Sequence, residues 1–224
     1  MNHKSHNRSR SRRLRSHTSD NAFVRVVHNV AGAPNVDVYV NNRRVLTNVA
    51  YKQVSPYLSL PEGRYTVTVF ATGDTQNPLI KQRLSVRDGR YFTVIAVGSV
   101  NNLDNLGLLV AQNDSSCPSR GSGNLRFIHG SADAPTVNVL VDGNVVLSDV
   151  SFGDVSRYLN LTAPRTYNIV VETTRERTKV LETSLRLGNR ENVSVLASGI
   201  PGNTATPLTA LVLVDNDQTC TISF

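Results

Sequence analysis

Short stretches of this chain alternate hydrophobic and polar residues, which is the pattern of half-buried β-strands. In VDVYV at residues 36–40, the three valines fall on one face of the predicted strand, and Asp37 and Tyr39 fall on the other. YTVTVF at residues 65–70 repeats this period of two. From residue 23 onward the sequence shows no helical periodicity, so it predicts an all-β protein.

Turn signals separate the predicted strands at intervals of about 8–12 residues. Asn41-Asn42, Asp88-Gly89 and Asp142-Gly143 are pairs that tolerate positive φ and favour tight hairpins. About seven or eight short strands fit between residues 23 and 117, which is typical of an antiparallel, immunoglobulin-like β-sandwich.

The chain contains the same sequence pattern twice. FVRVVHNVAGAPNVDVYV begins at residue 23 and LRFIHGSADAPTVNVLV begins at residue 125, and His28 and His129 are 101 residues apart. Two copies of this length are each large enough to bury a core of their own. The predicted organisation is a basic flexible tail at 1–22, a sandwich at 23–117, a linker at 118–124 and a second sandwich at 125–224.

Most of the positive charge lies at the N-terminus. The formal net charge is +7, and residues 1–20 contribute +5 of it, six cations against Asp20. The six cations are Lys4, Arg8, Arg10, Arg12, Arg13 and Arg15. The stretch is interpreted either as a solvated extension, as an arm that binds nucleic acid or another polyanion, or as an arm that contacts a neighbouring subunit. It lacks the apolar run of a secretory signal, so we expect synthesis in the cytoplasm without classical export.

The repeated pattern resembles a known family. The first copy carries VRVVH, an AGAP turn, VDVYV and YLSLPEGRYTVTVF, and the second carries RFIHGSADAP and YLNLTAPRTYNIVV. These stretches are similar to the bacterial domain of unknown function 4397. The resemblance covers nearly everything from residue 23 onward, and it implies a β-sandwich module of cell-surface and envelope proteins with no assigned activity.

His28 and His129 are the first candidates for chemistry, because each ends a predicted strand before a turn that holds Pro34 or Pro135. We interpret both imidazoles as structural groups that fix these loops by hydrogen bonds. A metal site would need companions, and Asp133, four residues after His129, corresponds to Gly32 in the first copy. Asp37 and Asn138 also correspond without sharing a charge. The sequence therefore predicts no metal, no cofactor and no catalytic site.

The chain has two cysteines, Cys117 and Cys220, at equivalent points after the last strand of each copy. They are interpreted as inert thiols, as cross-links between neighbouring molecules, or as an interdomain disulfide. The last of these requires Cα atoms within about 7 Å, and therefore a two-fold arrangement of the domains.

These observations favour a non-enzymatic structural protein that assembles into, or decorates, the surface of a spore, cell or virus particle. Self-association or contact with other coat proteins is expected, and CTISF at residues 220–224 is a candidate edge strand for it. The alternative is a module that binds carbohydrate or a cell-envelope polymer through the AGAP and ADAP loops. Exposed aromatic residues would favour that alternative, and the candidates are Tyr39, Tyr51, Tyr57, Tyr91 and Phe152.

Overall fold

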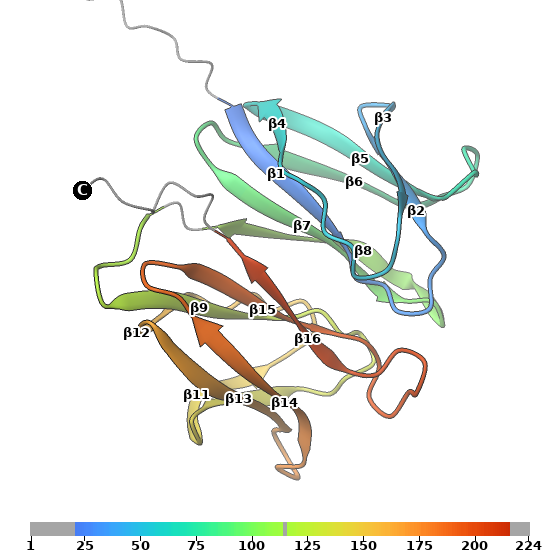
Figure 1. Ribbon diagram of the computed structural model, residues 1–224. Coiled ribbons are helices and arrows are strands. Elements are labelled where there is room, and N and C mark those ends of the chain that lie inside the picture. The colour runs from blue at the N-terminus through green and yellow to red at the C-terminus, as the bar shows by residue number, and fades with distance from the viewer. Residues whose placement is uncertain (1–20, 114–115, 216–224) are drawn as a thin grey trace, which may run out of the picture.

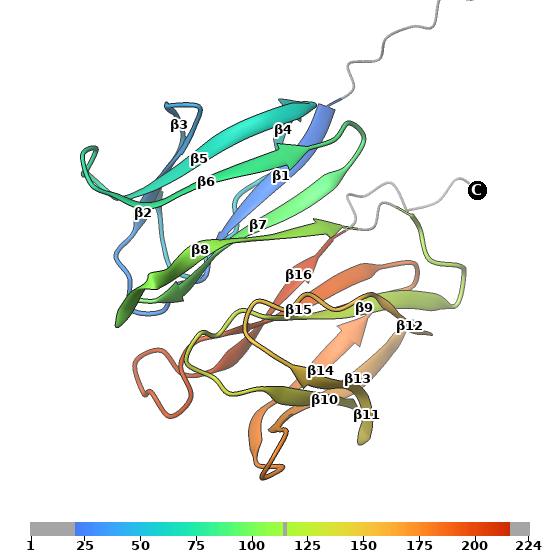
Figure 2. The same cartoon turned by 180° about the vertical axis from the view of Figure 1, so that it is seen from behind.

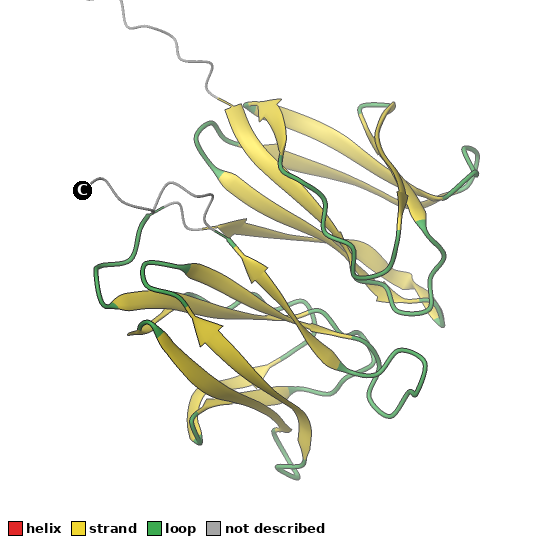
Figure 3. Ribbon diagram, viewed as in Figure 1, coloured by secondary structure: helices red, strands yellow, loops and turns green. Residues whose placement is uncertain are grey.

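The computed structural model of the protein describes residues 21–113 and 116–215. All regular secondary structure in these ranges is β-strand (Figure 3). The sixteen strands form four sheets of four strands, two sheets for each copy of the repeat. The predicted fold class, two tandem β-sandwiches, is confirmed.

The first domain comprises residues 21–113 and holds eight strands (Figure 1). They are β1 (Asn21–His28), β2 (Val36–Val40), β3 (Arg43–Val49), β4 (Leu58–Pro61), β5 (Gly63–Ala71), β6 (Pro78–Val86), β7 (Tyr91–Ser99) and β8 (Asn102–Asn113). Sheet A has the order β4-β1-β7-β8, and sheet B has the order β3-β2-β5-β6.

The second domain comprises residues 116–215 and repeats this topology. Its strands are β9 (Ser122–His129), β10 (Val137–Val141), β11 (Asn144–Val150), β12 (Leu159–Thr162), β13 (Arg165–Thr173), β14 (Lys179–Leu187), β15 (Asn192–Ser198) and β16 (Thr209–Val214). Sheet C has the order β12-β9-β15-β16, and sheet D has the order β11-β10-β13-β14. Because β9 begins at Ser122, the last three residues of the expected linker belong to a strand.

One strand pair in each domain runs parallel, which the expected antiparallel sandwich did not include. β1 pairs with β7, and β9 with β15, in parallel register, and the other strand pairs are antiparallel. Alternation of side chains reports which face is buried and carries no information on strand direction. The parallel pair places β1 in the interior of sheet A, between β4 and β7.

Two of the three predicted hairpin turns have the backbone that their residues favour, whereas Asp88-Gly89 joins β6 of sheet B to β7 of sheet A and is therefore not a hairpin. Asn41 and Asn42 have φ values of 47° and 66°, and Asp142 and Gly143 have φ values of 49° and 81°. Two consecutive residues with positive φ form the type of turn that matches the twist of an antiparallel hairpin. The turns therefore fix the register of β2 with β3 and of β10 with β11.

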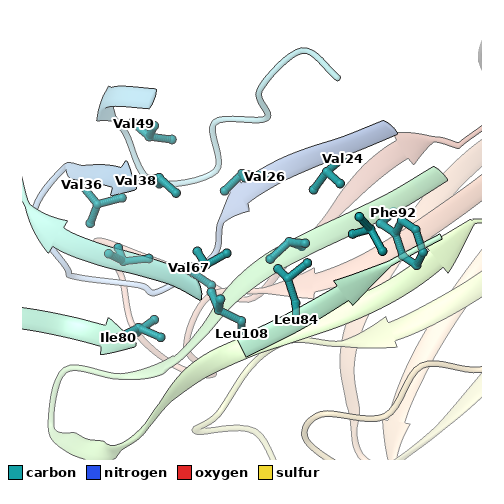
Figure 4. Packing of buried hydrophobic residues seen from close by; sticks show 14 of the residues in the cluster. Val24, Val26, Val36, Val38, Val49, Val67, Ile80, Leu84, Phe92 and Leu108 are labelled. Carbon is teal, nitrogen blue, oxygen red and sulfur yellow. The ribbon is translucent and has the colours of Figure 1, made fainter. Parts of the chain in front are cut away.

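Each domain has its own hydrophobic core between its two sheets. In the first domain the core is built mainly of valines, and Val24, Val38, Val67 and Leu84 point into it from four different strands (Figure 4). An equivalent cluster around Phe127, Val139 and Ile169 fills the second domain. Two separate cores confirm that the repeats are domains rather than turns of one solenoid.

The two sandwiches also share a third apolar cluster, which lies between sheets A and C. Val27 and Ile95 of sheet A pack with Ile128, Leu196 and Leu213 of sheet C. Both views of the ribbon show sheet A next to sheet C, with sheets B and D on the outside (Figures 1 and 2). The domains are therefore packed face against face, and they are not strung end to end.

Candidate functional site

A buried polar network joins the two domains at the centre of this contact. Val24 and Val26 of β1 point into the first core, so Arg25 between them points out toward the second domain. Its Nη1 donates to the carbonyl oxygen of Val214 at 2.7 Å, and its Nη2 donates to Oδ1 of Asp215 at 2.5 Å. The guanidinium therefore binds both the backbone and the side chain at the end of β16.

Arg126 of β9 makes the reciprocal contacts. Its Nη1 donates to the carbonyl oxygen of Gln112 at 2.7 Å, and its Nη2 donates to Oδ1 of Asn113 at 2.6 Å, both at the end of β8. Arg126 is the repeat equivalent of Arg25. Each domain thus offers an arginine to the end of the other domain's last strand, which is the pattern of a two-fold symmetric interface.

Asp215 is the one carboxylate of this network, and donors surround it. In addition to Arg25, the hydroxyls of Tyr158 and Ser194 donate to it, and Nη2 of Arg126 lies 3.5 Å from its Oδ2. The residue is 1% exposed. A buried carboxylate in this setting is a structural counter-charge to the two arginines rather than a group that exchanges protons with a substrate.

Two tyrosines close the network from the sides. The guanidinium carbon of Arg25 lies 5.2 Å from the ring centre of Tyr57, and that of Arg126 lies 4.6 Å from the ring centre of Tyr158, both within the range of cation–π contacts. Burial raises the pKa of Tyr57 above its ordinary value, and this outweighs the opposing effect of the charge on Arg25. Tyr57 thus stays a neutral hydroxyl, which accepts a hydrogen bond from Asn113.

The axis of the two-fold arrangement passes close to Asn29 and Gly130, which are equivalent positions of the repeat and touch each other. Nδ2 of Asn29 donates to the carbonyl oxygen of Gly130 at 2.9 Å. A Cβ atom at Gly130 would lie 2.5 Å from that same nitrogen. Such a Cβ atom would also lie 2.5 Å from Cδ1 of Leu196 and 2.9 Å from the backbone oxygen of Ala197, so the second domain itself favours glycine here.

Sequence analysis did not identify this interface. The signal was present, since Arg25 and Arg126 each interrupt an apolar strand at the same point of the repeat. Each arginine was interpreted only as part of the family pattern, and a contact between the two domains was not predicted from it.

His28 and His129 occupy matching positions in the two loops. Nε2 of His28 lies 3.0 Å from the carbonyl oxygen of Pro34, and Nε2 of His129 lies 3.1 Å from that of Pro135. Burial lowers the pKa of both imidazoles, although these backbone hydrogen bonds act in the opposite direction. Each imidazole thus lies within hydrogen-bond distance of the backbone of the loop that follows it. Within residues 21–113 and 116–215, no group of three or more His, Cys, Asp or Glu side chains could hold a metal ion.

Asp37 and Asn138 make equivalent hydrogen bonds although only Asp37 is charged. Oδ1 of Asp37 accepts the backbone N–H of Asn48 at 2.8 Å, and Oδ1 of Asn138 accepts that of Asp149 at 3.2 Å. Both acceptors hold a residue with φ of 55°. The pair is therefore explained by backbone geometry.

The five aromatic side chains proposed for carbohydrate binding are all half-buried. Tyr51 bonds to Ser198 across the domain interface, and Phe152 packs on the shared apolar cluster. Tyr57 belongs to the polar network, Tyr91 stacks on Phe23, and Tyr39 packs edge-on against Phe70. They therefore form no exposed aromatic platform.

A polar pocket of about 460 Å³ opens at the ADAP end of the second domain. Asp149, Arg175 and Glu176 line it, and they have no ion pair with any described residue. Thr174 also lines it, and its buried Oγ1 has no hydrogen-bond partner within the described ranges. In the first domain the corresponding Asn48 is bonded to Asn35 at 2.9 Å. The two repeats therefore differ in the side-chain contacts made at this position.

The cysteine and tail predictions fall largely outside the described residues. Cys220 and the six cations Lys4, Arg8, Arg10, Arg12, Arg13 and Arg15 are not described. The same holds for CTISF at the C-terminus. Cys117 lies four residues after Asn113, at the start of the second described range.

The chain was compared with known proteins. The family described as "Domain of unknown function (DUF4397)" matches residues 22–139 and 123–221. No curated protein matches the chain. A solved structure of a proposed polysaccharide-binding protein (DUF1812) from Bacteroides thetaiotaomicron is 12% identical, with coverage of 88% of this chain and 99% of that one, and its TM-score of 0.25 is too low to indicate a shared fold. The first match covers the first sandwich and continues into β10, and the second match covers the second sandwich. The chain therefore belongs to the DUF4397 family, as a tandem of two of its domains.

Proposed function

We propose that the protein is a non-enzymatic building block that assembles into, or decorates, the surface layer of a cell, spore or virus particle. The observation that carries the proposal is the network of Arg25, Arg126, Asn113 and Asp215. It commits three buried charged side chains, Arg25, Arg126 and Asp215, to one contact between the domains. The two domains then act as a single rigid unit. The outer faces of sheets B and D and the loops at the ends of the sandwiches are left to contact neighbouring molecules.

The polar groups of the network support a structural role. A catalytic acid, base or nucleophile must reach a substrate and change its bonding during the reaction. Arg25, Arg126 and Asp215 are 6%, 2% and 1% exposed, and each is hydrogen-bonded to the opposite domain or to its own. Residues 21–113 and 116–215 also contain no helix of the length and apolar character needed to cross a membrane.

Fractionation of the native source tests the proposal. We expect the protein in a sedimenting surface or particle fraction, from which denaturant releases it. The purified full chain should also self-associate in light scattering at high protein concentration. A freely soluble monomer in gentle extracts, with no self-association in vitro, would contradict the assembly function.

A second candidate function is the binding of a neutral or zwitterionic sugar in the polar pocket of the second domain. Charged side chains without ion pairs are the observation that favours it, because they can donate to and accept from the hydroxyl groups of a sugar. A glycan array should show binding that Asp149→Ala abolishes. Glu182→Ala, on the outer face of sheet D, is the matched control. The absence of any retained glycan would exclude this function.

A further inference from the structure

The outer face of sheet B is a basic surface. Val67, Val69, Ile80 and Leu84 point into the core, so the alternate residues of β5 and β6 point away from it. We use the name basic face for the four cations and two hydroxyls on this side. They are Arg44 of β3, Arg64 and Thr66 of β5, and Lys81, Arg83 and Ser85 of β6.

The register of the strands places these cations close together. Thr66 pairs with Arg83, Thr68 pairs with Lys81, and Arg64 pairs with Ser85. Neighbouring strands lie about 4.8 Å apart, and residues two apart on a strand lie about 7 Å apart. Lys81, Arg83 and Arg64 thus form a row of positive charges with spacings of roughly 7 to 8 Å.

Within the described residues, three of these four charges have no counter-charge. Arg64, Lys81 and Arg83 are exposed and form no ion pair with any residue that the structure describes. Arg44 has a single contact of 3.5 Å with Asp37. By contrast, three exposed cations of the second domain are paired, including Arg165 with Asp142 and Lys179 with Glu182. The exposed cations of the basic face are therefore able to bind anionic groups of another molecule.

The basic face belongs to one repeat only. Leu84 pairs with Tyr65 and Leu185 pairs with Tyr167, so Lys81 and Arg83 correspond to Glu182 and Ser184. Residues 21–113 carry nine cations and five anions, a net charge of +4, whereas residues 116–215 carry nine of each. The positive excess of the described chain is thus concentrated in the first domain.

The described part of the first domain begins close to the basic face. Asn21, where β1 begins, pairs with Pro61, which lies three residues before Arg64. Residues 1–20, which carry six cations, precede Asn21 in the sequence.

We propose that the basic face binds an acidic polysaccharide. Arginine and lysine bind the carboxylate or sulfate groups of such a polymer, and the interspersed hydroxyls of Thr66 and Ser85 suit its sugar hydroxyls. Nucleic acid is less well matched, because single strands are held by stacking on exposed rings. Tyr39 and Phe70, the rings of this face, are half-buried and packed against each other with 5.3 Å between their centres. This inference is independent of both functions proposed above.

Binding of the full chain to polygalacturonate, a linear polymer of a uronic acid, tests the proposal. The substitution Arg64→Gln/Lys81→Gln/Arg83→Gln should weaken binding roughly 10- to 100-fold at low salt, because three exposed charge contacts are lost. The wild-type protein should not bind the methyl-esterified polymer, which lacks the charge. Added salt should weaken binding of the wild type more than that of the triple variant.

The matched control is Arg157→Gln/Arg177→Gln/Arg186→Gln, which removes the same charge from exposed positions of the second domain. It should bind nearly as the wild type does. If both triple variants lost the same affinity, net charge alone would explain the binding and the proposal would be overturned. Unchanged affinity of the Arg64→Gln/Lys81→Gln/Arg83→Gln variant would also overturn it. Tighter binding to duplex DNA than to polygalacturonate, lost in the first variant, would assign the face to nucleic acid instead. Deletion of residues 1–20 should leave the difference between the two variants intact.

Discussion

Arg25 and Asp215 are 190 residues apart in the chain and form a direct ion pair, with 2.5 Å between Nη2 and Oδ1. Their side chains are 7% and 0% exposed, so the pair is shielded from solvent and from screening by salt. It ties the first strand of one domain to the end of the last described strand of the other.

Asp215→Asn is expected to destabilise the protein strongly. The substitution leaves the buried guanidinium groups of Arg25 and Arg126 without a counter-charge, which typically costs about 3–5 kcal/mol. Glu182→Gln is the control, because Glu182 pairs with Lys179 on the surface and its loss should have a far smaller effect on stability. Urea denaturation measures both, and similar small losses in the two variants would contradict the role assigned to Asp215.

The second domain alone, residues 116–215, should form a two-fold homodimer. Arg126 of each copy would face Asp215 of the other, and Gly130 would face Gly130 without a clash. The first domain alone should stay monomeric, because Arg25 would face the uncharged Asn113 and two Asn29 side chains would meet at the axis. Sedimentation equilibrium at micromolar concentration compares the two, and a monomeric second domain would count against the symmetric reading of the interface.

Cys117 and Cys220 are expected to form an intramolecular disulfide. Nη2 of Arg126 lies 2.6 Å from Asn113 and 3.5 Å from Asp215, so the two strands that precede the cysteines end at one guanidinium group. This is the two-fold arrangement that an interdomain bond requires. A disulfide typically stabilises a protein by about 2–4 kcal/mol.

Non-reducing gel electrophoresis of the natively isolated protein distinguishes the alternatives for the cysteines. A monomer that migrates faster than its reduced form indicates the internal bond, and the Cys117→Ser variant should abolish this shift. A ladder of multimers indicates cross-links between molecules. Unchanged migration of the native monomer would eliminate both.

Stability should fall as the pH is lowered through about 6.5, the pKa of histidine in an unfolded chain. Burial holds the pKa values of His28 and His129 below that value in the folded protein, so the unfolded state binds more protons in this range. The stabilisation is complete above about pH 7, and each histidine removes at most about 1.4 kcal/mol per pH unit below it.

Thermal or urea denaturation between pH 5.5 and 7.5 measures this dependence. The His28→Gln/His129→Gln variant keeps an amide that can donate to Pro34 and Pro135. It should be less stable at pH 7.5 but nearly independent of pH over the same range. A variant with the wild-type pH dependence would show that other groups are responsible.

Much of the fold followed from local sequence signals. Alternation in VDVYV and the turn pairs Asn41-Asn42 and Asp142-Gly143 specify faces and hairpins, which depend on residues close in the chain. The repeat spacing divided the chain into its two domains. The parallel pairing of β1 with β7 was not predictable in this way, because strand direction depends on the path of the intervening residues.

The domain interface could not be derived from local patterns. Arg25 finds Asp215 across 190 residues, and alternation shows only that Arg25 points away from its own core. Whether the outward face of a sheet is exposed to solvent or packs on another sheet depends on the second domain, which the local pattern does not describe. The basic face was overlooked for a related reason, since the near-neutral sum of the globular residues concealed an uneven distribution between the repeats.

The contact of Asn29 with Gly130 has a consequence for how the two halves can change. Two separate identical subunits are obliged to place the same side chain on both sides of their axis. Fusion into one polypeptide removes that obligation, so each half can acquire substitutions that the other could not tolerate. The two domains have diverged in this way: the second is neutral and has the polar pocket, and the first is cationic and has the basic face of sheet B.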